Sequence, residues 1–310
     1  MDQQYKIFTW PVQQQYLLEL AQGGFEIYIP EGQSESFRNL FAAQKNVIET
    51  NVAAIKDLQL DCILFQDEHS YQTAQYEVLS PQQRELPKIY LEHHPPKQHP
   101  TNAKHWVEDV DVQLVHVNHY NALMWNNNGL PVSVIENGVP ESDASFTGIK
   151  SCGVVVLEEN PAEDRVTGMD IFRQVKEALP LEVIQIGKKG ITYQNLAEKI
   201  SPYRFLFCPD RYASPGFAVQ QAMMIGMPVV GLATTDLPTI ISNEFSGFVH
   251  SDLQYLIKKM QQLITDPQLA AQLGANARSF AIKMFSSTRF LADWKQLIQK
   301  TVTNSLLTKI

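Results

Sequence analysis

Short runs of β-branched and aromatic residues alternate with longer segments of mixed polarity along this chain. In the first half such runs occur at residues 5–10, 25–30, 61–66, 88–92, 112–117 and 132–136. Between most of them the apolar positions recur at helical spacing, as in VQQQYLLELAQ (12–22), which ends at Gly23-Gly24. We expect this alternation to form a parallel sheet with helices on both faces.

A segment rich in turn residues, ENGVPESDASFTG (136–148), interrupts the pattern near the middle of the chain. The alternation then restarts, with strands expected at 153–158, 182–187, 205–210 and 228–233 and helices at about 168–179 and 217–226. From residue 252 onward we expect an almost wholly helical chain, in which Asp266-Pro267 begins a helix. The sequence therefore predicts two Rossmann-like, doubly wound α/β domains, 1–140 and 141–310.

The composition is that of a globular protein, with 44% hydrophobic and 19% charged residues. Its 310 residues suit two domains of roughly 150 residues each. No apolar run approaches the roughly 20 residues of a membrane span, and the start, MDQQYKIFTW, lacks the features of a secretory signal. Cys62, Cys152 and Cys208 are isolated, so we expect buried free thiols. These features favour a cytoplasmic protein.

The net charge of −8 is unevenly distributed along the chain. Residues 1–140 hold 8 basic and 17 acidic side chains, whereas the remainder holds 17 and 16. An acidic chain without a basic stripe is poorly suited to nucleic acid, because neutralisation of phosphates supplies most of that affinity. The same imbalance argues against strong attachment to an anionic membrane. The charge leaves the oligomeric state open.

The most informative stretch is CPDRYASPGFAVQQAMMIGMPVVGLATTDLPTIISNEFSGFVHSD, residues 208–252. It resembles the donor-binding core of family-4 GT-B glycosyltransferases, in which P-S-R-W-E-P-F-G is followed by E-A-M-A-x-G-x-P-V-V, by G-G-x-P-E-I-I and by N-G-F. The matching positions are Pro209, Arg211, Ala222, Met223, Gly226, Pro228, Val229, Val230, Pro238, Ile240, Ile241, Gly247 and Phe248. Residues 265–286 and the segment IENGVP (135–140) also resemble parts of the family.

The resemblance implies a retaining, metal-independent transfer of a sugar from a nucleotide-diphosphate sugar to a glycan, lipid or small-molecule acceptor. It implies two Rossmann-like domains that face a cleft, and a last helix, at about 287–310, that crosses back to the first domain. The donor would bind the second domain around 209–221 and 235–241, and the acceptor would bind the first. No metal or other cofactor is expected.

The chemistry of the residues also favours a donor site in this stretch. Ligands of doubly wound sheets bind beyond the carboxyl ends of strands, and residues 209–216 are expected to form a loop at such an end. The following helix directs its first amides at a diphosphate, and Gly216 allows the backbone to approach it. The side chain of Gln221, one turn along, is expected to reach a ribose. The expected donor contacts are Arg165, Ser214, Gly216, Phe217, Gln221 and Asp236.

Several family positions carry other residues in this chain. Two family glutamates fall on Ala213 and Gln221, and the two glycines of the later motif fall on Thr235 and Asp236. The segment LEENPAEDRVTGMDIF (157–172) is acidic, and only Arg165 in it is suited to contact phosphate. Each lost group would remove roughly 3 kcal/mol of transition-state stabilisation. The alternative is therefore a GT-B-shaped partner that binds sugar nucleotides or acts as a scaffold without turnover.

Six of the eight histidines lie between residues 93 and 119. The family often has a histidine after the strand expected at 88–92, and we match it to His93, with His94 as the close competitor. His93 would orient a sugar hydroxyl or transfer a proton. Packed or surface histidines are the alternative, and the spacing of the histidines follows no metal-ligand pattern.

The first helix supplies the remaining candidates for acceptor binding. Its start, PVQQQY (11–16), replaces the glycine-rich loop that often opens the first domain in the family. We expect Gln13, Gln14 and Tyr16 to lie on the acceptor side. The alternative is that these residues form only the exposed start of a helix.

Overall fold

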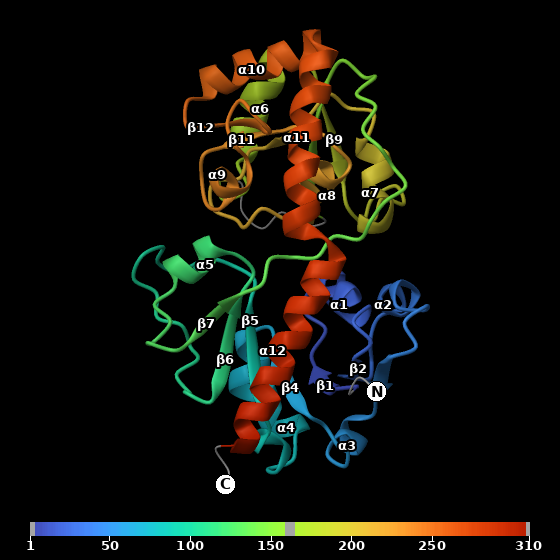
Figure 1. Ribbon diagram of the computed structural model, residues 1–310, viewed down its shortest axis with the longest axis vertical. Coiled ribbons are helices and arrows are strands. Elements are labelled where there is room, and N and C mark those ends of the chain that lie inside the picture. The colour runs from blue at the N-terminus through green and yellow to red at the C-terminus, as the bar shows by residue number, and fades with distance from the viewer. Residues whose placement is uncertain (1–3, 159–164, 308–310) are drawn as a thin grey trace. The chain divides into compact units, whose positions relative to one another are not determined.

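The computed structural model describes residues 4–158 and 165–307 and contains two parallel sheets with helices around them (Figure 1). The chain divides into two compact units, one formed by Met1–Gly138 with Ser287–Ile310 and the other by Val139–Ser286. Each unit is built on a sheet of its own. The predicted class, two doubly wound α/β domains, is confirmed.

The first unit has a seven-stranded sheet in the order β3-β2-β1-β4-β5-β6-β7. The strands are β1 Lys6–Thr9, β2 Glu26–Pro30, β3 Val47–Thr50, β4 Cys62–Phe65, β5 Lys88–Glu92, β6 Val112–His116 and β7 Val132–Val134. Every neighbouring pair is parallel. All seven strands therefore end at one edge of the sheet, where the loops carry the polar candidates of this unit.

Short helices connect these strands. They are α1 Gln14–Ala21, α2 Glu35–Leu40, α3 Val52–Ile55, a π-helix at Ser70–Ala74, α4 Gln75–Val78, a 3₁₀ helix at Gln83–Glu85 and α5 His119–Met124. The side chains of Ser34, Asn51 and Asn118 accept backbone N–H groups at the starts of α2, α3 and α5. Such caps stabilise helices that are otherwise too short to persist.

The core of the first unit follows from the apolar runs of the central strands. Phe8, Ile63, Tyr90 and Leu114, from four neighbouring strands, are buried. All residues of β4 are buried, because a parallel sheet covered on both faces needs continuous apolar strands. The polar residues that follow these strands are thereby held at a rigid edge.

The last helix, α12 (Ser287–Leu307), belongs to the first unit. The buried Trp294 donates its indole N–H to the hydroxyl of Tyr16 at 2.8 Å. Arg289 donates to the backbone carbonyls of Glu136 and Asn137, at 2.8 Å each. The expected return of the last helix to the first part of the chain is confirmed.

The second unit has a five-stranded parallel sheet in the order β12-β11-β10-β8-β9. Its strands are β8 Gly153–Leu157, β9 Leu181–Gln185, β10 Leu206–Cys208, β11 Val229–Leu232 and β12 Gly247–His250. Its helices are α6 Met169–Ala178, α7 Tyr193–Ile200, α8 Phe217–Met224, α9 Leu237–Ile240, α10 Leu253–Thr265 and α11 Pro267–Phe285. The Asp266 carboxylate accepts the backbone N–H groups of Gln268 and Leu269, which confirms the predicted helix start.

The pattern of the sequence missed two strands, β3 and β12. All four residues of β3 are only half-buried, so its apolar signal is weak at the edge of the sheet. β12 lies at an edge of the second sheet and begins with Gly247, a residue that depresses strand propensity. Both edge strands form because a neighbouring strand supplies their backbone partners.

Gly168, the N-cap of α6, provides a test of how closely the chain before α6 packs on the loop after β10. Gly168 and Gly190 both have left-handed backbones, with φ of 68° and 71°. A Cβ on Gly168 would lie 1.9 Å from the carbonyl oxygen of Pro209, whereas one on Gly190 would meet no described atom within 4 Å.

We expect Gly168→Ala to lower the free energy of unfolding of the second unit by roughly 3 kcal/mol, because it adds a steric clash to a left-handed backbone. The matched variant Gly190→Ala should cost about 1 kcal/mol, the conformational part alone. Urea denaturation of both variants measures the difference. Equal losses would contradict the close packing of residue 168 on the loop after β10.

Candidate functional site

The loop after β10 lies at the carboxyl edge of the second sheet, between the ends of β8 and β11. It passes through the half-buried Ser214 to the exposed Gly216, which precedes α8. Gly216 has an extended backbone, and no described side chain caps the helix. No described atom lies within 4 Å of the position that a Cβ would take there. The start of α8 is therefore open, and its first amides are oriented as in anion-binding helix termini.

Gln221 lies one turn into α8 and is 6% exposed. Its Nε2 donates to the backbone carbonyl of Tyr193 at 2.8 Å, which fixes the orientation of the carboxamide. Its Oε1 is buried and accepts no hydrogen bond from a described residue. An unpaired buried acceptor costs roughly 1–3 kcal/mol. This oxygen is therefore chemically suited to accept a hydroxyl.

Two aromatic rings lie beside this carboxamide. Phe217 precedes Gln221 by four residues and therefore shares its face of α8. The centroid of the Phe217 ring is 5.7 Å from that of Tyr193, at the start of α7. The hydroxyl of Tyr193 donates to the carboxylate of Glu158, which follows β8. Gln221 is therefore linked to α7 through the backbone of Tyr193, and Phe217 through its ring.

Asp210 makes the edge of this sheet acidic. Burial, together with the neighbouring Glu158 carboxylate, raises the pKa of Asp210 to about 6. The thiol of Cys208 donates to Asp210 Oδ2 at 3.1 Å, and the hydroxyl of Thr234 donates to its backbone carbonyl at 2.8 Å. Asp210 lies three residues before Ala213, the position at which the family resemblance has a glutamate.

The two arginines near this edge both contact Asp170, in the first turn of α6. Arg211 donates to both carboxylate oxygens, at 2.6 and 2.7 Å, and holds the pKa of Asp170 at about 2. Nη1 of Arg165 lies farther from the Asp170 carboxylate, 3.4 Å from Oδ2, and the Arg165 side chain is 79% exposed. Arg165 is thus the more available cation, whereas Arg211 is committed to its carboxylate. Of the acidic residues expected before Arg165, Glu159, Glu163 and Asp164 lie outside the described residues.

Asp236, expected as a donor contact, is 3% exposed and immediately precedes α9. Its side chain is enclosed by protein, as that of Gln221 is. The neighbouring Thr235 has a φ of 50°, in the left-handed region that a β-branched residue rarely adopts. The resemblance has a glycine at that position, a residue for which this backbone conformation carries no steric cost.

In the first unit, His93 directly follows β5 and is buried. Its Nε2 lies 3.1 Å from Oε1 of Gln66, and Nε2 of Gln66 donates to the hydroxyl of Thr9 and the carbonyl of Trp10. His93 therefore donates from Nε2, and Nδ1 carries the lone pair. Burial, aided by His94, lowers the pKa of His93 to about 3. It is thus a neutral hydrogen-bonding group at physiological pH.

The three residues expected on the acceptor side lie in different environments. Gln13 is half-buried at the N-cap of α1, and Gln14 is exposed in the first turn. Tyr16 instead lies in the core, 1% exposed, where its hydroxyl accepts from Trp294 and its ring is 5.2 Å from that of His93. Tyr16 thus packs against His93 within the core and does not face an acceptor. Its buried ring also packs against α12 through Trp294.

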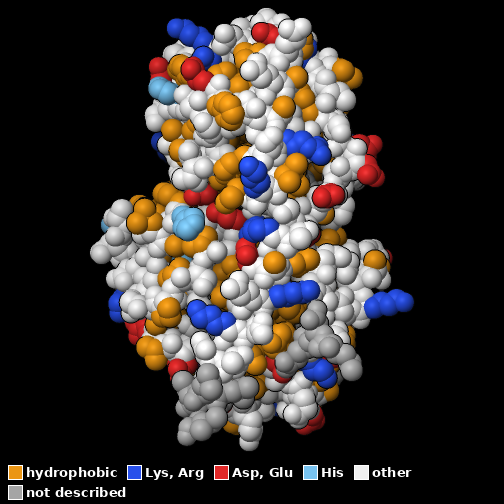
Figure 2. Space-filling model, viewed as in Figure 1, with side chains coloured by type: hydrophobic (Ala, Val, Ile, Leu, Met, Phe, Trp, Pro, Cys, Tyr) orange, Lys and Arg blue, Asp and Glu red, His pale blue; other side chains and the backbone are white. Residues whose placement is uncertain are grey.

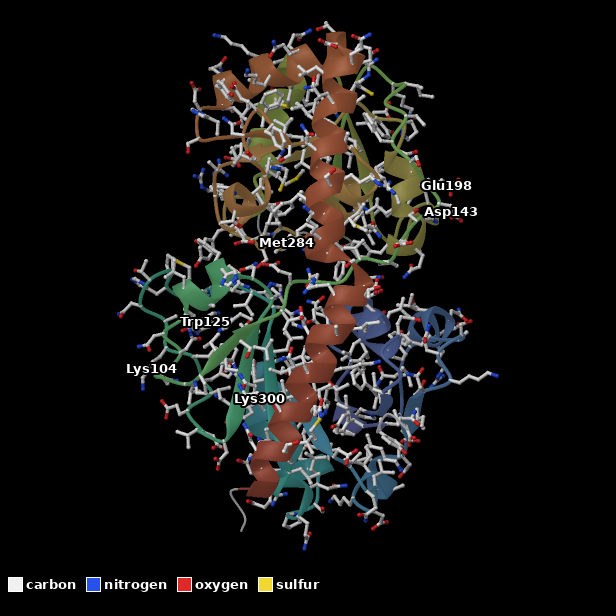
Figure 3. The ribbon with its side chains drawn as sticks, viewed as in Figure 1. Lys104, Trp125, Asp143, Glu198, Met284 and Lys300 are labelled. Atoms are coloured by element: carbon white, nitrogen blue, oxygen red, sulfur yellow. The ribbon has the colours of Figure 1, made fainter. Side chains whose placement is uncertain are left out.

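Two other histidines, His105 and His116, lie buried with their rings 6.1 Å apart. His105 lies 3.4 Å from the Glu92 carboxylate and 5.0 Å, ring to ring, from Trp125, the residue labelled in Figure 3. His116 is fully buried and donates to Asn127 at 2.9 Å. Across residues 4–158 and 165–307, no group of three or more histidine, cysteine or acidic side chains is arranged to hold a metal ion.

Sequence reasoning missed Gln66, Asp170 and Tyr193. Gln66 follows the fully buried β4 as His93 follows β5, so its place at the carboxyl end of an apolar run was a usable signal. Tyr193 contributes a backbone carbonyl and a hydroxyl from α7, a helix that the pattern did not predict. Asp170 meets Arg211 across 41 residues, which no local pattern reveals.

No family model matches this chain, and no curated protein matches it. Solved structures do match. Sucrose-phosphate synthase from Thermosynechococcus elongatus is 13% identical with a TM-score of 0.71, over 97% of this chain and all of that one. HepE from Anabaena, in complex with UDP-glucose, is 14% identical with a TM-score of 0.70. That match also covers 97% of this chain and all of the HepE chain.

S. aureus TarM, in complex with fondaparinux, α-GlcNAc-glycerol and UDP, is 14% identical with a TM-score of 0.59. That match covers 80% of this chain and 58% of the TarM chain. The identities are low, so these likenesses show the fold alone. The fold is the one that these glycosyltransferases share.

Membrane spans are not found among the described helices, none of which has the length and apolarity that a crossing requires.

The buried histidines make the stability of the first unit dependent on pH. Burial lowers the pKa of His116 to about 4, against 6.5 in an unfolded chain. As the pH falls, the unfolded state binds the proton at a higher pH than the folded state does. The stability that depends on a neutral His116 is therefore fully present above about pH 6.5 and is lost as the pH falls toward 4.

We expect the first unit to lose roughly 3 kcal/mol through His116 alone between pH 7 and pH 4. His116→Gln should flatten this dependence, whereas the matched variant His119→Gln, at an exposed position of α5, should leave it unchanged. All four tryptophans, Trp10, Trp106, Trp125 and Trp294, belong to this unit, so their fluorescence in urea titrations reports its unfolding. The same slope in wild type and His116→Gln would contradict the assignment.

Proposed function

We propose that this chain is a glycosyltransferase that binds a nucleotide-diphosphate sugar on its second unit and transfers the sugar to an acceptor held on its first unit. The observation that carries the proposal is the open, uncapped start of α8 at Gly216, at the carboxyl edge of the second sheet. A cytoplasmic location suits the three free cysteines.

The donor diphosphate would lie against the first amides of α8, where the helix dipole stabilises negative charge. Arg165 is exposed and only loosely paired with Asp170, so it is free to turn toward the phosphates. As the sugar leaves, the same groups would stabilise the charge that develops on the diphosphate. A ribose hydroxyl would donate to the unpaired oxygen of Gln221.

The acceptor would lie at the carboxyl edge of the first sheet. Gln66 holds the imidazole of His93 in one tautomer, so its Nδ1 is a hydrogen-bond acceptor of fixed orientation. A neutral imidazole suits the positioning of a sugar hydroxyl and the acceptance of its proton. Gln13 and Gln14 would add carboxamide contacts from the start of α1.

UDP-sugars are the first donors to test, because HepE was solved with UDP-glucose. A thermal-shift screen compares UDP, GDP and ADP, and a second assay measures hydrolysis of the corresponding sugar nucleotides. We expect one nucleotide to raise the melting temperature and its sugar conjugate to be hydrolysed slowly. Absence of any shift with all three nucleotides would overturn the proposal.

The second candidate is a partner that binds a sugar nucleotide without turnover. Ala213 favours it, since alanine replaces a family glutamate, and so does the acidic pair of Glu158 and Asp210. A nucleotide that stabilises the protein while its sugar conjugate stays intact in the presence of acceptors would support this candidate.

Gln221 tests the placement of the nucleotide. We expect Gln221→Leu to weaken binding of the stabilising nucleotide by about tenfold, since one buried hydrogen bond is worth roughly 1 kcal/mol or more. The matched variant is Gln220→Leu, which removes an equally buried carboxamide that projects about 100° away on the same helix. Isothermal titration calorimetry compares the nucleotide affinities of the wild type, Gln221→Leu and Gln220→Leu. Equal affinities would exclude Gln221 from the site.

A further inference from the structure

Several basic side chains of the first unit lie at one edge of its sheet, where Lys6 pairs with Glu26 and Lys88 with Asp109. Lys6 and Lys88 begin β1 and β5, while Lys45, Lys56 and Arg84 lie in the connections that enter β3, β4 and β5. Because all strands of the sheet are parallel, these basic residues lie at its amino edge. Ligands of such sheets bind at the opposite edge.

Other basic residues of this unit are committed to partners. Arg38 donates to both carboxylate oxygens of Glu49, at 2.9 and 3.1 Å. Lys104, labelled in Figure 3, lies 3.0 Å from Glu108. Arg289 holds the carbonyls at 136 and 137 and lies 3.0 Å from Asp293.

The remaining basic residues described in this unit are Lys97, Lys295 and Lys300. Lys300 is eleven residues beyond Arg289 on α12, or about 16 Å at the helical rise, and Figure 3 shows it well along that helix. Lys295 is likewise more than one turn past Arg289. Of these three lysines, Lys97 is thus the one near the carboxyl edge, and it is exposed in the loop after β5.

The carboxyl edge carries different chemistry. Glu31 follows β2, and Asp67 and Glu68 follow β4; Glu31 and Glu68 are exposed. The carboxamide of Gln66 directly precedes Asp67, and it is joined at 3.1 Å to the imidazole of His93 at the end of the neighbouring strand β5. In the lower half of Figure 2, the coloured Lys and Arg side chains of the first unit lie apart from one another on the face that is shown.

We infer that the acceptor is an uncharged, hydroxyl-rich carbohydrate, and that phosphorylated and carboxylated acceptors are disfavoured. This inference rests on the proposed function and defines its acceptor. Carboxylates, carboxamides and a neutral imidazole each accept or donate single hydrogen bonds to hydroxyls. Recognition of a phosphate or carboxylate instead uses arginine or lysine, and an anion at this edge would meet like charge.

The test uses the full-length protein with the sugar nucleotide that it hydrolyses. Neutral gluco-, galacto- and manno-oligosaccharides are offered beside the same sugars carrying a 6-phosphate or a uronic acid. Transfer is read by mass spectrometry of the products. We expect products from neutral members only, with at least about tenfold lower transfer to their charged counterparts.

Preferential transfer to a charged acceptor, or transfer to none of the neutral ones, would overturn the inference. Failure of the proposed function is visible separately, because nucleotide binding and donor hydrolysis are measured before any acceptor is added.

A charge reversal at the edge provides a second readout. We expect Glu68→Lys to raise the ratio of kcat/KM for the phosphorylated acceptor to that for its neutral counterpart by about threefold, since it removes like charge and adds a cation. Glu77→Lys is the matched control, because Glu77 is exposed on α4 and changes the net charge equally. A ratio that moves equally in both variants, or in neither, would contradict selection by charge at this edge.

Discussion

In each unit the strands run parallel, and this constraint places the polar groups that follow the strands at one edge of the sheet. A parallel sheet covered by helices buries its strands on both faces, so polar side chains collect where the strands end. Gln66 and His93 lie at adjacent ends in the first sheet, and Asp210 lies at an end in the second. The rigid edge then holds hydrogen bonds such as that between Gln66 and His93, at 3.1 Å.

The two edges differ in what they offer a ligand. The second sheet presents an open helix start at Gly216 together with the exposed Arg165, which suits an anion. The first sheet presents a neutral imidazole, carboxamides and carboxylates, while most of its basic residues lie elsewhere or are paired. In the proposed reaction, the charged donor would bind the second edge and the hydroxyl-rich acceptor the first.

Burial decides what the polar groups at these edges are able to do. His93 is too deeply buried to ionise at neutral pH, so it offers a ligand only the hydrogen bonds of a neutral imidazole. Burial has the opposite effect on Asp210, whose pKa of about 6 makes its charge sensitive to a nearby anion. The unpaired oxygen of Gln221 is tolerated because the carboxamide is anchored at its other end.

Close backbone packing shapes the second edge as much as its side chains do. Gly168 allows the chain before α6 to lie against the carbonyl of Pro209, and Asp170 then reaches both oxygens toward Arg211. This contact occupies the arginine that the family resemblance placed in the motif. Of the two arginines near this edge, Arg165 is left more exposed than Arg211.

The sequence by itself determined the two α/β domains, most strands, the helix start at Asp266 and the loop at 209–216, because these follow from apolar periodicity and local capping. It did not determine the edge strands β3 and β12, whose partners lie on other segments. Only the tertiary structure decided that Tyr16 and Asp236 are enclosed, since burial depends on helices far away in the chain, such as α12. The pairs between Gln66 and His93 and between Arg211 and Asp170 likewise join residues 27 and 41 positions apart. Periodicity reports which face of an element is apolar, whereas the partner of a polar side chain is set by which strand ends become neighbours.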